Sequence, residues 1–393
     1  MDLKVLHLSK YFPPHTGGME TYLRDLMAAQ ARQNLDVEAL VHQSATGFHT
    51  ETGSYPVGDQ QLPITRAAVW ATLLFTPISP IFPWLLRRIL KRTQPDILHL
   101  HMPNPSVFWV LLLPRAKNIP WVIQWHADVP ASRHSLGLRV FHRVYHLLER
   151  AMLKRCQAII ASSPPYLASS VPLREFREKS HVIPLGLDPA RLPPPGQRQT
   201  SQQTINSPLR ILAVGRLTYY KGFEYLIRAA KRCASAEIHL VGEGDQEPKL
   251  RALVRELDLD NRVFFHGRLP DTQLAQQFAQ CDCLCLPSIE RTEAFGMVLL
   301  EAMYCGKATL VSNVPGSGMG WVVDDGITGL HVPPENIDAL ADSMRKLHQN
   351  RDRIAHLGKN GRQRFDRLFH IDKSASGVSE LYELVLRTAT GNQ

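Results

Sequence analysis

Glu293, Gly296 and Glu301 are the group of residues in this chain whose types and spacing best suit chemistry. The apolar run 281–287 before them predicts a buried strand, and we expect a helix to begin near Phe295, at the carboxyl end of that strand. Ligands of open α/β sheets bind at this edge. The spacing therefore places one carboxylate before the helix and a second one two turns inside it.

The start of the predicted helix suits a phosphate. The first N–H groups of a helix have no partner within it and lie at the positive end of its dipole, and glycine lets a ligand approach the backbone closely. The residues that offer these groups are Phe295, Gly296, Met297 and Val298. Glu301 would repel a phosphate, but its carboxylate accepts hydrogen bonds from a pair of sugar hydroxyls. The stretch predicts a ligand made of phosphate and sugar.

Two cations follow another predicted strand, 209–215. Arg216 and Lys221 are five residues apart around a turn, so both can converge on one diphosphate, and arginine offers a fork of donors to phosphate oxygens. A turn exposed to solvent is the alternative. Gly242 and Gly244, after the next strand, lack the third glycine of a dinucleotide fingerprint, so a nicotinamide cofactor is only weakly indicated.

The first half of the chain has its own residues at predicted strand ends. Gly17 and Gly18 lie between the first strand and the first helix, where a double glycine either forms a simple turn or lets a ligand reach the backbone. His126 ends the predicted strand 121–125 on the same edge of the sheet. Because that edge is where ligands bind, we favour a functional role for His126.

Three further polar residues near these strand ends are weaker candidates for acceptor binding: His101, Asn104 and Asp128. His99 shares a strand face with His101, and a single histidine of this kind is more often structural, so His99 is given that role. Together these residues predict a second group of polar side chains at the edge of the first sheet.

The chain reads as two α/β domains. Its 393 residues are 44% hydrophobic and 21% charged, which is typical of globular protein. Alternating strands and helices predict doubly wound parallel sheets in 1–190 and again in 209–370, joined by a proline-rich polar linker, 191–208. Residues 46–65 are polar and glycine-rich and are expected to form a loop. Residues 371–393 are expected to contain a terminal helix.

The cysteines and the amino terminus bear on the compartment. Cys281, Cys283 and Cys285 alternate along a strand, and no second Cys or His pair follows at zinc spacing, so we favour a buried face and predict no metal. The chain begins with a predicted strand rather than a signal peptide, which favours a cytoplasmic location. No stretch reaches the roughly 18 to 20 apolar residues that span a bilayer.

The net charge of +9 requires a partner. Two segments, 81–92 and 133–155, combine apolar residues with several Lys and Arg. Each is either a core helix with a solvated basic edge or a helix that lies on an anionic membrane surface. Binding to nucleic acid would also explain the charge, but the basic residues are not interleaved with aromatics in a repeating pattern, so no nucleic acid is predicted.

Four motifs in order make the chain resemble glycosyltransferase family 4, whose members are retaining enzymes of the GT-B fold, with two Rossmann-like domains facing a central cleft. The motifs are Gly215-Arg-Leu-x-x-x-Lys221-Gly222, Phe265-x-Gly267, Glu293-x₇-Glu301 and Asp325-Gly-x-Thr-Gly-Leu-x-x-Pro333. The resemblance is strong over about 209–334. In the first half it is confined to 11–20 and the surroundings of His126.

The resemblance assigns roles toward a nucleotide-diphosphate sugar. It implies that Arg216 and Lys221 bind the diphosphate and stabilise it as the leaving group, with Gly17 and Gly18 contacting it from across the cleft. His126 would contact the transferred sugar beside the reacting carbon.

The same resemblance assigns the remaining residues of the second half. It implies that Glu293 binds hydroxyls of the donor sugar, Glu301 the ribose, and Leu269 the base through its backbone. No metal and no cofactor besides the donor would be needed, because the cations and the helix start already balance the leaving charge. A terminal helix would cross back to the first domain.

The activity implied is transfer of a hexose from a nucleotide sugar to a lipid-linked or polysaccharide acceptor in bacterial surface-glycan synthesis. Residues 125–129 and 320–323 are similar to those of enzymes that often transfer mannose, whereas 316–320 and Ala308 depart from the common pattern. Retention would follow from attack on the same face of the sugar. The enzyme would work at the inner face of the cytoplasmic membrane. A sugar-nucleotide epimerase of the same architecture is the alternative activity.

Overall fold

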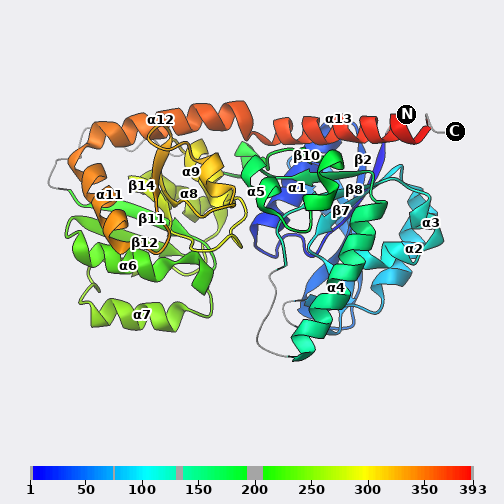
Figure 1. The fold of residues 1–393 in the computed structure, drawn as a ribbon, viewed down its shortest axis with the longest axis horizontal. Coiled ribbons are helices and arrows are strands. Elements are labelled where there is room, and N and C mark those ends of the chain that lie inside the picture. Colours follow the sequence, from blue (N-terminus) through cyan, green and yellow to red (C-terminus); the bar gives the residue numbers. More distant parts are fainter. Residues whose placement is uncertain (1–2, 74–75, 130–135, 193–206, 391–393) are drawn as a thin grey trace. The chain divides into compact units, whose positions relative to one another are not determined.

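The structure, a computed structural model, describes residues 3–73, 76–129, 136–192 and 207–390, with only the backbone described for 136–141 and 389–390. The chain divides into two compact units (Figure 1). Unit 1 comprises Met1–Gly186 and Ile371–Gln393, and unit 2 comprises Leu187–His370. Most of the predicted linker and the start of the basic segment 133–155 lie outside the described residues.

Unit 1 is built on an eight-stranded sheet in the order β10-β9-β8-β7-β1-β2-β4-β3. Its strands are β1 (Lys4–Leu8), β2 (Asp36–Thr46), β3 (Glu51–Val57), β4 (Gln60–Val69), β7 (Ile97–Met102), β8 (Trp121–Trp125), β9 (Ala158–Ala161) and β10 (Ser180–Val182). A separate short hairpin is formed by β5 (Ala71–Leu73) and β6 (Thr76–Ile78). All neighbours in the large sheet are parallel except β3 and β4. The central strands β7 and β8 are buried throughout, as parallel strands covered on both faces must be.

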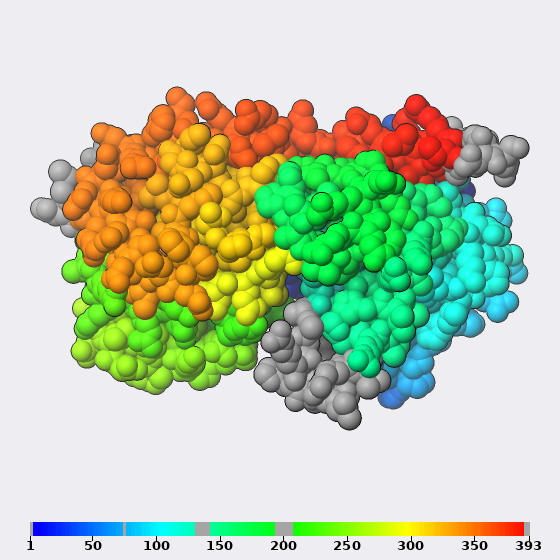
Figure 2. Space-filling view, viewed as in Figure 1, coloured from blue at the N-terminus to red at the C-terminus, as the bar shows by residue number. Residues whose placement is uncertain are grey.

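The helices of unit 1 include the last helix of the chain. They are α1 (Gly18–Arg32), α2 (Phe82–Thr93), α3 (Pro114–Lys117), α4 (Leu136–Arg155), α5 (Pro164–Ser169) and α13 (Ile371–Thr390), with short 3₁₀ helices η1 (Pro105–Leu111) and η2 (Arg174–Lys179). α13, red in Figures 1 and 2, lies beside α1. Buried hydroxyls join the two helices, with Tyr22 Oη 2.9 Å from Ser374 Oγ.

The expectation of a loop at 46–65 is wrong. Most of these residues form β3 and β4, which pair antiparallel around a two-residue turn at Gly58 and Asp59. The polar composition was misleading because β3 is an edge strand and most of its side chains are exposed. Only β4 contributes buried apolar residues, among them Leu62 and Ile64.

Unit 2 contains a six-stranded, fully parallel sheet in the order β13-β12-β11-β14-β15-β16. Its strands are β11 (Leu209–Val214), β12 (Ala236–Val241), β13 (Val263–Phe265), β14 (Cys283–Leu286), β15 (Ala308–Ser312) and β16 (Gly329–Val332). Its helices are α6 (Phe223–Arg232), α7 (Glu247–Glu256), α8 (Asp271–Gln280), α9 (Met297–Tyr304), α10 (Met319–Val322), α11 (Ile337–Gln349) and α12 (Arg351–Leu368), with 3₁₀ helices η3 (Pro189–Arg191) and η5 (Tyr219–Lys221). One apolar core runs from β11 and α6 to α11.

Each large sheet reverses its strand order at one point. In unit 1 the reversal lies between β1 and β7, and in unit 2 it lies between β11 and β14. At such a point the loops after the two strands leave toward opposite faces and open a crevice at the carboxyl edge of the sheet. Most of the residues that the sequence singled out follow β1, β11 or β14, whereas His126 follows β8 and Leu269 follows β13.

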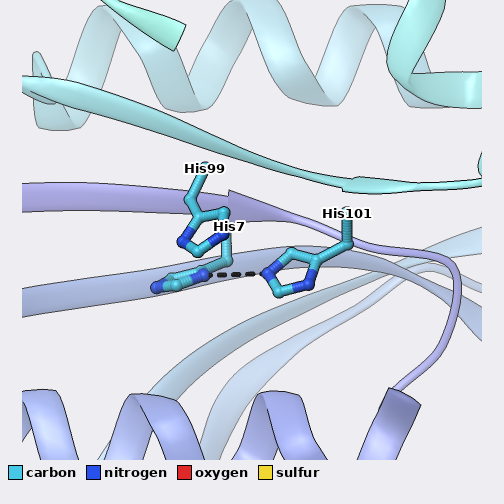
Figure 3. Close-up of side chains that lie close together, drawn as sticks. All are labelled: His7, His99 and His101. Carbon is cyan, nitrogen blue, oxygen red and sulfur yellow. Dashed lines mark hydrogen bonds between the residues drawn. The ribbon is translucent and has the colours of Figure 1, made fainter. Parts of the chain in front are cut away.

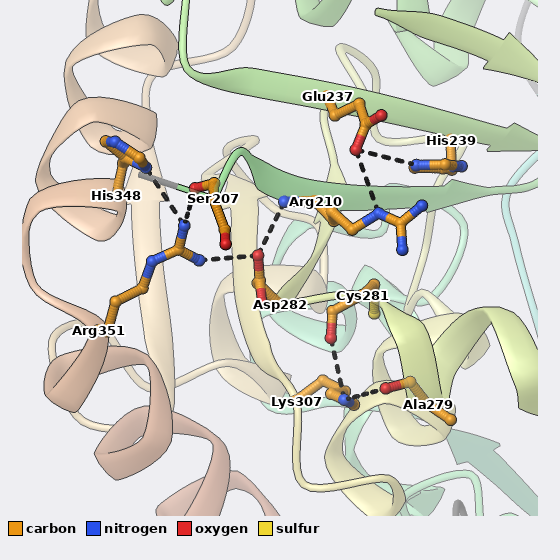
Figure 4. A network of polar contacts seen from close by, with 10 residues as sticks. All are labelled: Ser207, Arg210, Glu237, His239, Ala279, Cys281, Asp282, Lys307, His348 and Arg351. Carbon is orange, nitrogen blue, oxygen red and sulfur yellow. Dashed lines mark hydrogen bonds and ion pairs between the residues drawn. The ribbon is translucent and has the colours of Figure 1, made fainter. Parts of the chain in front are cut away.

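The opposite edge of the unit 2 sheet carries a polar network with a structural role (Figure 4). Asp282 accepts hydrogen bonds from the backbone N–H of Arg210 and from the guanidinium of Arg351, both at 2.8 Å. Lys307 donates to the carbonyl oxygens of Ala279 and Cys281. The network joins the amino ends of β11 and β14 to α8 and α12, which fixes the sheet from below the ligand edge.

Candidate active site

Two loops of unit 2, which follow β11 and β14, are packed directly against each other. A side chain at Gly222 would place its Cβ 2.2 Å from the carbonyl oxygen of Pro287, and the φ of Gly222 is +66°, so the position requires glycine on both counts. Next to it, the backbone N–H of Ile289 donates to the carbonyl of Tyr220 at 2.8 Å. This close approach brings the residues after β11 next to those after β14.

Lys221 and Glu293 form an ion pair where these loops meet. Both side chains are nearly buried, with 11% and 12% of their surfaces exposed. Burial on its own lowers the pKa of Lys221, but electrostatic interactions with Glu293 and Tyr220 raise it, and the net direction is upward. Lys221 is therefore a fixed cation at the carboxyl end of β11, as the sequence predicted.

The backbone around Glu293 is held by residues that the sequence analysis did not assign. The Ser317 hydroxyl donates to the carbonyl oxygen of Glu293, and the N–H of Gly318 donates to that of Ala294 at 2.8 Å. Ser317 and Gly318 belong to 316–320, the segment that departs from the family pattern. Its small residues allow this close contact, which holds the backbone at Glu293 and Ala294 in place.

The helix predicted near Phe295 begins two residues later. α9 starts at Met297 and is capped by Gly296, whose φ of +82° is left-handed. Phe295 and Gly296 are buried, whereas Met297 and Val298 are half-buried. The first N–H groups of α9 thus begin at the edge where the Lys221–Glu293 pair lies, which suits a phosphate.

Glu301, predicted to accept hydrogen bonds from a ribose, has a protein partner. Its carboxylate pairs with the guanidinium of Arg191, which also contacts Asp271 at 3.2 Å. Arg191 ends η3 and is the first residue of the predicted linker 191–208, so no role was expected for it. Because Arg191 and Glu301 are nearly buried, the pair fixes the carboxylate of Glu301 inside unit 2.

The other predicted contacts of unit 2 lie nearer the surface. Arg216 is exposed directly after Gly215, and its charge acts on Lys221 by lowering the pKa of that ammonium. Leu269 is half-buried in the loop after β13, where its backbone role toward a base stays a prediction. The turn after β11 therefore carries two cations: Arg216, which is exposed, and Lys221, which is nearly buried and paired with Glu293.

In unit 1 the double glycine forms the start of a helix. Gly17 is the N-cap of α1, and Gly18 is its first residue. The carbonyl of Gly17 accepts from the N–H of Thr21 at 3.1 Å, and the Glu20 carboxylate lies where a Cβ on Gly17 would stand. The predicted approach of a ligand to this backbone is untested, but α1 does begin at the carboxyl end of β1.

His126 lies directly after β8 and is buried, with 6% of its surface exposed. Its backbone N–H donates to the carbonyl of Met102 at 2.9 Å, and its ring nitrogen Nε2 is 3.0 Å from Nδ1 of His101. Nδ1 of His126 is buried and has no hydrogen-bond partner among the described residues. Burial lowers the pKa of His126 to about 3, so the ring is neutral at physiological pH.

Two more histidines lie beside His101 (Figure 3). They are His7 of β1 and His99 of β7, and His7 Nδ1 is 3.1 Å from His101 Nε2. Within the described part of the chain, these three are the group whose ring nitrogens could hold a metal ion, being within 4.8 Å of one another. Desolvation lowers the pKa of all three, so they form a neutral cluster.

Asn104 and Asp128 have hydrogen-bond partners inside unit 1. The side chain of Asn104 accepts from the N–H of Ser106 and caps η1. Asp128 accepts from the indole N–H of Trp125 at 2.8 Å and from the Ser170 hydroxyl at 2.7 Å. These bonds give both side chains a structural role, and their predicted contact with an acceptor stays untested.

All six cysteines are buried and free. Cys281, Cys283 and Cys285 lie in or next to β14, and burial raises the pKa of Cys283 and Cys285. Such thiols are unreactive, as expected for a buried strand face.

The fold and the site define a class of protein: two mostly parallel α/β sheets, with a buried cation, a carboxylate and a helix start at the switch point of the second. Two family models divide the chain between them. The model described as Glycosyltransferase Family 4 matches residues 16–191, and that described as Glycosyl transferases group 1 matches residues 197–364.

Two bacterial relatives match nearly the whole chain. The O-antigen chain mannosyltransferase C of Escherichia coli is 28% identical over 98% of this chain and 100% of its own length. The D-rhamnosyltransferase WbpZ of Pseudomonas aeruginosa is 30% identical over 93% of this chain and 92% of its own. The chain therefore belongs to glycosyltransferase family 4.

Solved structures confirm the fold. Sucrose-phosphate synthase from Thermosynechococcus elongatus superposes with a TM-score of 0.79 at 23% identity, covering 98% of this chain and 100% of that one. Anabaena HepE in complex with UDP-glucose gives 0.72 at 22%, covering 97% and 99%. The predicted GT-B fold and glycosyltransferase activity are confirmed. Of the helices that the structure describes, none has the length and apolarity needed to cross a membrane.

Proposed function

We propose that this enzyme transfers a hexose, with retention, from a nucleotide-diphosphate sugar to a lipid-linked or polysaccharide acceptor in bacterial surface-glycan synthesis. The observation that carries the proposal is the buried Lys221–Glu293 pair at the switch point of unit 2. One partner is a cation for a diphosphate and the other an acceptor for sugar hydroxyls. The pair therefore offers a group for the diphosphate and a group for the sugar next to each other.

The charges in unit 2 support a role for the diphosphate as leaving group. Cleavage of the bond between the anomeric carbon and the diphosphate places negative charge on the diphosphate. Lys221, Arg216 and the start of α9 stabilise that charge, and each such donor is typically worth about 3 kcal/mol. Lys221 does so without reorganisation, because its ammonium is already held by Glu293.

Retention has two possible routes. A double displacement requires a carboxylate nucleophile beneath the sugar. The family resemblance favours instead a same-face attack, in which the departing diphosphate accepts the proton of the acceptor hydroxyl. Following the configuration of the new bond by NMR tests the retention itself, since an inverted product excludes both routes.

The relatives support a donor sugar of the manno series. One of them is named a mannosyltransferase and the other a D-rhamnosyltransferase. D-rhamnose is the 6-deoxy form of mannose, so the two sugars share the configuration of their ring hydroxyls. Glu293 would then recognise hydroxyls that are common to both.

A membrane surface is the proposed location of the acceptor, and unit 1 supports it at α4 rather than α2. The apolar side chains of α2 are mostly buried in the core, and its basic residues Arg87, Arg88 and Lys91 form the exposed edge. On α4, by contrast, Val144 and Leu147 are 51% and 70% exposed. Figures 1 and 2 show part of α4, in blue-green, at the surface.

An apolar groove lies beside these exposed residues. Its volume is about 300 Å³, and its walls come from η1, α4 and the residues after η1. Leu112 in its wall is 67% exposed and Trp109 is 39% exposed. Exposed apolar surface of this kind marks interaction sites, contact with a membrane among them, and the exposed Arg143, which precedes Val144 on α4, would meet anionic headgroups.

Incubation with a panel of UDP-, GDP- and ADP-linked sugars, with and without a polyprenyl-diphosphate-linked sugar acceptor, tests the activity. We expect nucleotide diphosphate to appear with a manno-configured donor and to rise at least tenfold when the acceptor is added. Conversion of the donor to an isomer without release of nucleotide would instead identify an epimerase.

Sedimentation with vesicles that contain anionic lipid tests the location. We expect the double variant Leu112→Ser with Leu147→Ser to lose most of its vesicle binding. Charge reversal at Arg87, Arg88 and Lys91 is the matched variant on α2, and we expect it to lose less. Binding that is absent in the parent, or unchanged in the α4 variant, contradicts the proposed membrane contact.

A further inference from the structure

Unit 1 contains a continuous chain of buried hydrogen bonds that ends at His126. From His126 it passes through His101 to His7, whose Nε2 is 2.9 Å from Oε1 of Gln30 on α1. The amide nitrogen of Gln30 donates to the Tyr382 hydroxyl on α13 at 3.2 Å. Every member of this chain is buried, so water cannot easily exchange with its bonds.

The chain has a direction, and Gln30 sets it. A glutamine side chain has one acceptor and one donor end, and here the donor end faces Tyr382 while the acceptor end faces His7. His7 must therefore donate through Nε2. Because a neutral imidazole carries one proton, Nδ1 of His7 is then an acceptor.

The same rule fixes the next two rings. Nδ1 of His7 can bond Nε2 of His101 only if that nitrogen donates, which leaves Nδ1 of His101 as an acceptor. Nε2 of His126 must then donate to it. The ring proton of His126 is thus used in the hydrogen bond to His101. Its Nδ1, which is buried and has no partner among the described residues, carries a lone pair.

We propose that Gln30, His7 and His101 act as positioning residues that hold His126 as the Nε2–H tautomer, so that Nδ1 accepts a hydrogen bond from a hydroxyl of the transferred sugar. This rests on the proposed function for the identity of the ligand, but not for the tautomer. In this state His126 has no proton to give to the departing diphosphate. Its role is to bind and orient the sugar as a neutral acceptor.

A metal at His7, His99 and His101 is the competing use of the same nitrogens. The hydrogen bond between His7 and His101 argues against it, because one of these two nitrogens must carry the proton that they share. No carboxylate belongs to this described group, so a divalent charge there would be buried without compensation. A metal would also need the lone pairs of the nitrogens that His7 and His101 use to bond each other, so the chain of hydrogen bonds from Gln30 to His126 would be broken.

NMR of the intact two-unit protein labelled with ¹⁵N-histidine reads the tautomer directly, because protonated and unprotonated ring nitrogens differ widely in chemical shift. Signals of His7, His101 and His126 are assigned from single His→Gln variants. We expect Nε2–H and bare Nδ1 at all three. Nδ1–H at His126, a tautomer mixture, or zinc found bound to the purified protein would each overturn the proposal.

Two substitutions at one position separate positioning from packing. His101→Gln can still accept from His126 with its oxygen and donate to His7 with its nitrogen, so the His126 tautomer should persist. His101→Leu fills similar space but breaks the chain, and His126 should then show both tautomers. We expect kcat to fall about tenfold in His101→Leu and to recover to within about threefold in His101→Gln.

Nucleotide diphosphate binding, measured by calorimetry, completes the test. We expect it to be unchanged in both variants, because Lys221 and Arg216 are in unit 2. Equal loss of kcat in His101→Leu and His101→Gln would contradict the positioning role. If the tautomer is as expected but no sugar is transferred, the proposed function fails while the assignment of the His126 proton stands.

Discussion

The switch points of the two sheets carry opposite electrostatics. In unit 2, the loops after β11 and β14 place an ion pair, Lys221 with Glu293, at the edge of the sheet. In unit 1, the strands β1 and β7 carry His7, His99 and His101, and burial keeps all of them neutral. Similar sheets therefore hold a charged group at one switch point and a neutral hydrogen-bonding group at the other.

Under the proposed function, the difference follows from what each group binds. A diphosphate is anionic, so the group that meets it must keep its charge, and Lys221 keeps its own because Glu293 compensates for burial. A sugar hydroxyl is neutral, and a neutral imidazole with a fixed proton offers it one directed acceptor. A charged histidine there would cost desolvation energy and would lose the acceptor.

Acidification should have the largest effect, because we expect it to unfold unit 1 before unit 2. The pKa of His7 is lowered to about 4 and that of His126 to about 3, and those of His99 and His101 are also lowered. Stability is then fully present above the unfolded pKa of about 6.5 and is lost as pH falls, because the unfolded chain binds protons that the folded unit excludes. Between its unfolded pKa and its folded pKa, each such histidine lowers the free energy of unfolding by up to about 1.4 kcal/mol for each pH unit of acidification.

Hydrogen exchange followed by mass spectrometry, at pH 7.5, 6.5 and 5.5, checks this expectation peptide by peptide. Protection of β1 and β7 should fall well before that of β11 and β14. Unit 2 contains a pair of histidines with lowered pKa, His239 and His266, against the four of unit 1 named above. Its protection should therefore fall less steeply with pH. His101→Gln removes one titrating group and should reduce the pH dependence of unit 1. Equal loss in both units would refute the contrast.

Removal of the charge from unit 2 should have the next largest effect. Lys221→Ala or Arg216→Ala removes a donor to the leaving diphosphate, and we expect kcat to fall at least about a hundredfold. Steady-state kinetics with the preferred donor measures it. Lys249→Ala is the matched control, because Lys249 is an exposed lysine of unit 2 that pairs only with Glu224 among its described ion pairs. Near-normal turnover in either site variant contradicts the assignment.

The residues of unit 2 were largely predictable from sequence, and those of unit 1 were not. Lys221, Glu293 and Gly296 stand in short local motifs at strand ends, so spacing alone placed them. His7 and Gln30 carry no such signal, because their partners His101 and Tyr382 are distant in sequence and meet only through sheet order and through α13. A single buried histidine in a strand looks structural until its neighbours are known.

Arg191 was missed for a related reason. It is the first residue of the proline-rich polar stretch 191–208, which was predicted as a linker, and its partner Glu301 is 110 positions away. The wrong expectation of a loop at 46–65 had the same origin, since an edge strand exposes polar residues just as a loop does. Local composition identifies what is exposed, but pairing between distant segments decides what is ordered.

Arg191→Met should have an intermediate effect, and it tests whether Glu301 of unit 2 acts in donor binding or in the chemical step. Loss of the guanidinium leaves Glu301 nearly buried without its observed partner, so its carboxylate is no longer held in place. We expect the KM for the donor to rise about tenfold and kcat to change less, because Glu301 is assigned to the ribose and not to the reacting carbon. Asp271→Asn, which removes the exposed partner of Arg191, is the control and should change KM by less than about threefold. A fall in kcat with constant KM would show that Arg191 acts on the chemical step instead.

Chelation should have the smallest effect of all, and it tests both switch points together. In unit 2, the proposed function has Lys221, Arg216 and the start of α9 supply positive charge to the diphosphate, so we expect no divalent ion to be needed there. In unit 1, the ring nitrogens of His7 and His101 are committed to each other and to Gln30. We therefore expect excess EDTA to change the initial rate by less than about twofold. Loss of activity that magnesium or manganese restores would place a metal with the diphosphate, whereas loss that only zinc restores, with a shift in the histidine NMR signals, would place it on the imidazoles.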